Sequence, residues 1–102
     1  MNHYFLHGKL TAKAGQAEQL SNILLQAAEL VSTAKGCKLY VIGRDPEDTK
    51  AVWVTEIWES KADHDNSLHV EGVKELISKA MPILDGPPQK GQELEILGGA
   101  GI

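Results

Sequence analysis

The chain has 102 residues, the size of one domain, and its 42% hydrophobic and 24% charged residues are typical of a globular protein rather than a disordered one. A net charge of −4 argues against nucleic acid or an anionic membrane as a partner. No apolar run approaches the roughly 20 residues of a membrane span, and the amino terminus lacks a signal-peptide pattern. Cys37 has no second cysteine to pair with, so we expect a reduced, cytoplasmic protein.

The first half of the chain predicts a strand, a helix and two further strands. Residues 4–11 carry apolar side chains on both faces of an extended segment, as in a sheet that is at least partly covered on both sides. From residue 15 to about residue 35, apolar residues recur at steps of three and four, which predicts an amphipathic helix. Residues 37–44 and 50–58 predict an antiparallel hairpin, because a proline-containing acidic turn at residues 45–49 separates them.

The second half predicts two helices. Ser60 and Asp63 have the spacing of a loose capping box, so a short helix should begin there and end near residue 68. Apolar side chains at helical spacing predict another helix over residues 70–81, which Pro82 ends.

The remaining segments complete a single domain over residues 1–97. A loop at residues 85–88 precedes a last strand at residues 92–97, and the glycine-rich residues 98–102 predict a flexible tail. The element order is β-α-β-β-α-β, the ferredoxin-like α+β pattern, with a four-stranded antiparallel sheet and its helices on one face.

The opposite face of this sheet has no predicted cover. Strand alternation places Phe5 on it, together with a row formed by Trp53, Thr55 and Ile57. Because the chain is too short for another layer, we expect a homodimer that packs two such sheets together around a two-fold axis. His3 and His7 lie on the same face and predict polar interface contacts; they are too far apart along a strand to share one metal ion within a subunit.

Three segments carry a family resemblance. These are residues 8–15 (GKLTAKAG), the pattern Gly36-Cys37-x-x-Tyr40, and Glu56-x-Trp58-Glu59-Ser60 followed by a helix. Together the chain resembles the antibiotic biosynthesis monooxygenase family, whose subunits form a dimeric α+β barrel. Known members include cofactor-free monooxygenases that oxidise quinols or polyketide anthrones, haem-degrading enzymes, and isomerases of a phosphorylated autoinducer.

The chain departs from the family pattern at several positions. Many members carry histidines where this sequence has Ser67 and Gly72, whereas its own histidines are His64 and His69. Haem-degrading members use an asparagine on the first strand, and the matching position is Gly8. The resemblance therefore favours an oxygenase that needs no cofactor or metal over haem degradation.

Two candidate site residues share one face of the third strand. Trp58 is either a flat wall for stacking an aromatic substrate or a core tryptophan that fixes the following helix. Glu56 either has a functional role, as a hydrogen-bond partner of a substrate hydroxyl or as a base whose pKa burial raises, or it pairs with a lysine or caps the backbone.

The other candidates follow the tryptophan or lie on the second strand. His64 could take a phenolic proton near neutral pH, or it could be a surface histidine among acidic residues. Ser67 is a candidate hydrogen-bond donor, and His69 a second acid–base group or an exposed side chain. Tyr40 is either a pocket hydroxyl or a core aromatic.

The leading hypothesis is a homodimeric, cofactor-independent monooxygenase that oxidises a quinol-like or polycyclic phenolic molecule with dioxygen. In it, His64 is the catalytic base and Trp58 stacks the ring, while Glu56, Ser67 and Tyr40 orient hydroxyl groups. An electron-rich phenolate can reduce dioxygen without a metal or flavin, so the protein need only bind, deprotonate and exclude water. A non-catalytic dimer that binds small molecules or has a stress-associated role is the alternative. An isomerase of a small phosphorylated compound ranks third, because few lysines are near the predicted cleft.

Overall fold

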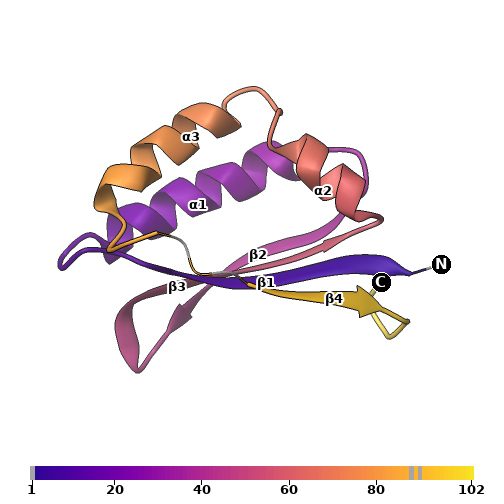
Figure 1. Ribbon diagram of the computed structural model, residues 1–102, viewed down its shortest axis with the longest axis horizontal. Coiled ribbons are helices and arrows are strands. Elements are labelled where there is room, and N and C mark those ends of the chain that lie inside the picture. Colours follow the sequence, from indigo (N-terminus) through magenta and orange to yellow (C-terminus); the bar gives the residue numbers. More distant parts are fainter. Residues whose placement is uncertain (1, 88, 90) are drawn as a thin grey trace.

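The computed structural model describes every residue except 1, 88 and 90, and it contains one four-stranded antiparallel sheet with its helices on one side (Figure 1). The strand order is β2-β3-β1-β4, which confirms the ferredoxin-like prediction. The strands are β1 (His3–Thr11), β2 (Cys37–Asp45), β3 (Asp48–Trp58) and β4 (Gln92–Ile96). The helices are α1 (Ala17–Val31), α2 (Lys61–Ser67) and α3 (Val73–Ala80), and a 3₁₀ turn, η1 (Met81–Ile83), follows α3.

The helix-facing side of the sheet is organised in rows that cross the strands. Tyr40, Glu56 and Leu6 form one row, because β2 pairs with β3 and β3 with β1 at these positions. The next row towards α2 contains Trp58 and Tyr4. Two apolar clusters fill the space above the rows. The larger joins α1, α3 and β3, and the smaller joins Val31, Trp58 and Val73.

Both predicted long helices are shorter than the sequence pattern indicated. The first helix does not begin at residue 15 or continue to residue 35; it spans Ala17–Val31. The hydroxyl of Ser32 donates to the carbonyl of Glu29 at 2.7 Å, and serine and threonine side chains that bond to nearby backbone favour helix ends. The helix predicted over residues 70–81 starts only after Gly72, whose φ of 91° lies outside the helical region. It is α-helical to Ala80, and Pro82 lies inside the 3₁₀ turn rather than after the helix.

The start of α2 is fixed by a cap and by a close approach. The Ser60 hydroxyl accepts a hydrogen bond from the Asp63 backbone N–H at 3.1 Å, which confirms the predicted N-cap. Gly36 has a φ of 83°, and a Cβ at this position would overlap the Asp63 carboxylate. The Gly36 carbonyl also accepts from the Glu59 N–H at 2.8 Å. The turn before β2 is thereby joined to the end of β3.

The outer face of the sheet has the predicted composition. Register pairs Phe5 with Ile57 and His7 with Thr55, so these side chains share one face with Trp53. The imidazole of His7 stacks on the indole of Trp53 with a centroid separation of 4.7 Å. Val41 and Leu94 are 50% and 53% exposed. The helices lie on the other side of the sheet (Figure 1), so no second layer from the described chain covers this face.

The ends of the chain add little to the fold. Residues after Ile96 belong to no strand or helix and are exposed. Pro88 of the predicted loop lies outside the described residues. Among the helices that the structure describes, none combines the length and apolar character of a membrane span.

Candidate functional site

A cavity of about 390 Å³ lies between the helix-facing side of the sheet and the helices α1 and α3. Its sheet side includes Leu6, Leu10 and Val54, and apolar side chains of both helices line the rest. Gly8 belongs to the lining, and a Cβ there would meet only the Cα of Gly91, at 3.7 Å. The glycine therefore leaves space that a larger residue would fill. The result is a pocket suited to a hydrocarbon-rich ligand.

The polar side chains on the helix-facing side of the sheet that line this cavity come from one row. Glu56 on β3 and Tyr40 on β2 are paired across the two strands, and both line the pocket. Among the described lining residues, Glu56 supplies the one carboxylate. A ligand in this pocket would thus meet mostly apolar walls, with this pair as the polar side chains of the helix-facing rows and Lys9 and Gln89 elsewhere in the lining.

Glu56 is a buried acid held by a tryptophan. Only 6% of the residue is exposed, and its Oε1 accepts a hydrogen bond from the indole Nε1 of Trp58 at 2.9 Å. Burial raises the pKa of Glu56 above its usual value, because the charged form loses water; the Trp58 hydrogen bond and the nearby His64 act in the opposite direction. A buried carboxyl group with a raised pKa is a common form of general base or acid.

His64 lies beside this acid and outside the cavity lining. Its Nε2 is 3.8 Å from Glu56 Oε1, and its Nδ1 is 3.0 Å from Asp65 Oδ1. The imidazole also contacts Tyr4, with ring centroids 5.4 Å apart, and meets the edge of Trp58 at 6.1 Å. The structure therefore brings together His64, Glu56 and Trp58 as a connected group, in which Glu56 is the member that reaches the cavity.

Trp58 occupies the core rather than the cavity wall. It is 0% exposed, is packed with Val31 and Val73, and does not belong to the lining residues. Of the two interpretations of this residue, the structure favours the core tryptophan that fixes the following helix. In addition, the indole N–H of Trp58 donates a hydrogen bond that orients the Glu56 carboxylate. The partner of Glu56 is therefore a tryptophan. The structural alternatives, pairing with a lysine or capping the backbone, are not seen among the described residues.

Ser67 and His69 are not brought to the cavity. The Ser67 hydroxyl donates to the His64 carbonyl at 2.5 Å, so the buried side chain is used within α2. His69 is exposed and lies beyond the end of α2. Neither residue belongs to the lining.

The tyrosines near the site are hydrogen-bond donors at neutral pH. Burial raises the pKa of Tyr40 well above its usual value, and the nearby Glu56 adds to this. Burial and a hydrogen bond to Glu93 raise the pKa of Tyr4 to about 12. Tyr40 can therefore donate from its phenolic group to a ligand oxygen, and it is ill suited to act as a base.

Sequence reasoning did not find Tyr4, or Asp65 as a partner of His64. Strand register offers a signal for Tyr4, because it lies opposite Trp58 on the helix-facing side. The adjacency of His64 and Asp65 in the sequence gave no indication that the two side chains bond. Within the described part of the chain, no group of three or more His, Cys, Asp or Glu side chains gathers as a metal site.

The comparisons with known proteins agree with this geometry. The family model described as antibiotic biosynthesis monooxygenase matches residues 3–79. The chain belongs to this family. A solved structure from Chloroflexus aurantiacus J-10-fl, which carries the name of the same family, is 36% identical, with a TM-score of 0.87 and 98% of each chain covered.

More distant members of the family preserve the same fold. A structure from Caulobacter crescentus CB15 has a TM-score of 0.85 at 17% identity and covers 95% of this chain and 92% of its own. One from Nitrosomonas europaea has a TM-score of 0.87 at 13% identity, with 93% and 90% covered. Both carry the family name. A comparison with curated proteins finds no match.

Proposed function

We propose that this family member is a cofactor-independent monooxygenase that oxidises a quinol-like or polycyclic phenolic molecule with dioxygen. The observation that carries the proposal is the apolar cavity with one buried carboxyl group, Glu56, in its lining. An aromatic substrate would fill the apolar part, and its hydroxyl would lie at the row of Glu56 and Tyr40. Such a site binds, deprotonates and keeps out water, which is what this chemistry asks of a protein.

The reaction balances with dioxygen as the oxidant. For an anthrone, removal of a proton gives an enolate, which passes one electron to dioxygen and forms a carbon radical and superoxide. Their combination makes a carbon–oxygen bond, and protonation gives a hydroperoxide. Loss of water then converts the CH₂ carbon into a carbonyl. One oxygen atom enters the product, the other leaves as water, and four electrons pass from carbon to oxygen.

In this proposal, Glu56 is the group that receives the substrate proton. Its Oε1 is engaged by Trp58, and among the described residues Oε2 has no hydrogen-bond partner. Tyr40 would donate to the substrate oxygen. His64 would act through Glu56, since its Nε2 lies beside that carboxylate and its ring is outside the lining.

The proposal includes a homodimer formed through the outer face of the sheet. Phe5, Trp53 and Ile57 form an apolar surface there that no described segment covers. Packing against a second copy would remove this surface from water, and burial of apolar area is the main driving force for such association. Sedimentation of the purified protein measures the assembly directly, and a monomer at micromolar concentration would contradict it.

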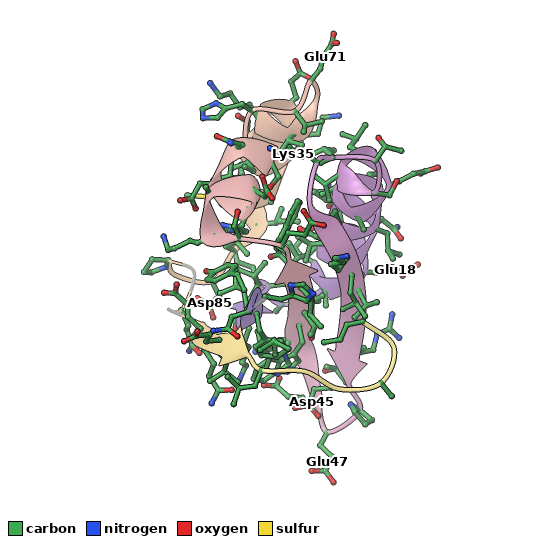
Figure 2. All side chains as sticks on the ribbon, turned by 90° about the vertical axis from the view of Figure 1, so that its right-hand side faces the viewer. Glu18, Lys35, Asp45, Glu47, Glu71 and Asp85 are labelled. Atoms are coloured by element: carbon green, nitrogen blue, oxygen red, sulfur yellow. The ribbon has the colours of Figure 1, made fainter. Side chains whose placement is uncertain are left out.

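Oxygen uptake tests the proposed activity. The purified, metal-stripped protein would be mixed with a panel of quinols and anthrones, and uptake would be compared with the autoxidation background. The Glu56→Gln variant should lose about 100-fold or more in rate, the usual contribution of a positioned base. Glu71→Gln is the matched control, because Glu71 projects from the surface far from the sheet (Figure 2). Equal rates for the wild type and Glu56→Gln would refute the assigned role.

A specific observation also favours the second candidate, a non-catalytic binding dimer. The imidazole of His64 is outside the lining, and Ser67 is used within its own helix. That candidate predicts thermal stabilisation by aromatic ligands with no oxygen uptake across the panel. An isomerase of a phosphorylated compound has less support, because Lys9, the one cation in the described lining, is paired with Asp48 at 3.3 Å.

A further inference from the structure

We infer that Asp65 is a positioning residue, which holds the His64 ring with its Nδ1 protonated and its Nε2 lone pair turned towards Glu56. This inference rests on the proposed function, in which Glu56 receives a proton from the substrate. It assigns a route for that proton out of the cavity, along Glu56, His64 and Asp65. The three residues come from β3 and α2, and they connect a buried carboxyl group with an exposed one.

The hydrogen bond to Asp65 determines which ring nitrogen carries the proton. Asp65 Oδ1 lies 3.0 Å from His64 Nδ1, and an ionised carboxylate can only accept. The proton of the neutral imidazole must then be on Nδ1. Its Nε2 is the nitrogen with a free lone pair, and that atom is 3.8 Å from Glu56 Oε1.

Several side chains surround this imidazole, and the cation among them, Lys61, favours an ionised Asp65. Lys61 on α2 contacts the second oxygen of Asp65, Oδ2, at 3.6 Å, so both oxygens are occupied by donors. The hydrogen bond from His64, helped by Lys61, lowers the pKa of Asp65. From β1, the ring of Tyr4 contacts His64, and its hydroxyl donates a hydrogen bond to Glu93 of β4.

Exposure along the three residues gives the route a direction. The Glu56 side chain is 8% exposed, that of His64 is 16% exposed and that of Asp65 is 53% exposed. A proton that Glu56 takes from the substrate would pass to Nε2 through one water, because the 3.8 Å between Nε2 and Glu56 Oε1 is longer than a hydrogen bond. That transfer returns Glu56 to its ionised form. The resulting imidazolium lies between the carboxyl groups of Glu56 and Asp65. Release of the Nδ1 proton to Asp65 or to water leaves the neutral ring with its proton on Nε2, and proton exchange with water then restores the Nδ1–H form that Asp65 holds.

Nitrogen NMR of the full chain tests the inference without depending on a substrate. With ¹⁵N-labelled histidine at a pH where His64 is neutral, the wild type should show the Nδ1–H tautomer. Asp65→Ala removes the acceptor and should shift the ring to the Nε2–H form. Asp65→Asn keeps an amide oxygen and should retain the Nδ1–H form. Lys61→Ala removes the other contact of Asp65 and should also retain it.

Oxygen uptake with anthrone as the probe supplies the second readout. Asp65→Ala should lower kcat by about tenfold or more with little change in KM, because the route and not the pocket is altered. Asp65→Asn should recover part of that loss. An Nε2–H tautomer in the wild type, or an unchanged tautomer in Asp65→Ala, overturns the inference whatever the activity. A full rate in Asp65→Ala overturns the proton route. Absence of uptake in the wild type refutes the proposed function, whereas the tautomer of Asp65→Ala still decides the role of Asp65.

Discussion

Replacing Trp58 with phenylalanine removes two interactions that differ in their dependence on pH. The first is packing, because the indole is 0% exposed and its cluster leaves no room for solvent. Phenylalanine has about three fewer ring atoms, and at about 0.8 kcal/mol per buried methylene-sized group the loss is roughly 2 kcal/mol. This part of the free energy of unfolding should not change with pH.

The second interaction is the indole hydrogen bond to Glu56 at 2.9 Å. A hydrogen bond to a charged group contributes about 1.5–3 kcal/mol, and this contribution requires the ionised carboxylate. The indole lowers the pKa of Glu56, so its removal raises that pKa further above the value in the unfolded chain. The folded variant then binds more protons than the unfolded one, and its stability falls as pH rises through the interval between the two pKa values. The total loss should therefore grow from about 2 kcal/mol near pH 4.5 to roughly 4 kcal/mol at pH 8.

Urea denaturation at the two pH values measures this difference. Protein concentration must be held fixed, because association would stabilise the folded state. The same substitution in a Glu56→Gln background is the control, since the neutral amide removes the pH-dependent part. A loss that is equal at both pH values in the wild-type background would refute the reasoning, and so would a pH-dependent loss that persists in the Glu56→Gln background.

Three further substitutions test Glu56 and two glycines with positive φ. Glu56→Gln keeps an acceptor for the indole and removes a buried charge, so its stability relative to the wild type should rise with pH above about 4.5, the pKa of an unperturbed glutamate. Urea titrations across a pH series measure this, and Glu71→Gln, at an exposed position, should show no such trend. Gly15→Ala should cost about 1–2 kcal/mol, because this glycine has positive φ and no neighbour that a methyl group would meet. Gly36→Ala should cost roughly 2 kcal/mol more, since its methyl group would overlap Asp63; equal melting temperatures for the two glycine variants would contradict this contact.

Period-two alternation was sufficient to place side chains on the correct face of the sheet. Trp58 and Glu56 lie on the helix-facing side and Trp53 and Thr55 on the other, as predicted. The Ser60 cap was also accessible, because its partner lies only three residues away. Such local rules depend on backbone geometry within a few residues and need no knowledge of the tertiary structure.

The location of the cavity along that face could not be obtained in the same way. Alternation alone does not predict which row of side chains across the sheet lies beneath α1 and α3 and which lies beneath α2. That depends on where the helices begin and end. Apolar periodicity placed the end of the first helix and the start of the last helix wrongly, because the Ser32 hydroxyl bonds to the backbone and Gly72 has a positive φ. For this reason Trp58 was a candidate cavity wall in the sequence and is core in the structure.

The helix that covers the cavity and the polar side chains of the sheet that line it belong to different parts of the fold. Glu56 and Tyr40 are held by strand pairing, whereas α3 packs on α1 and continues into η1. Lining residues of α3, such as Val73 and Ile77, set the height of the space and carry no charge. Natural variation in this short helix therefore offers a route to new ligands that leaves the carboxylate and its partners intact.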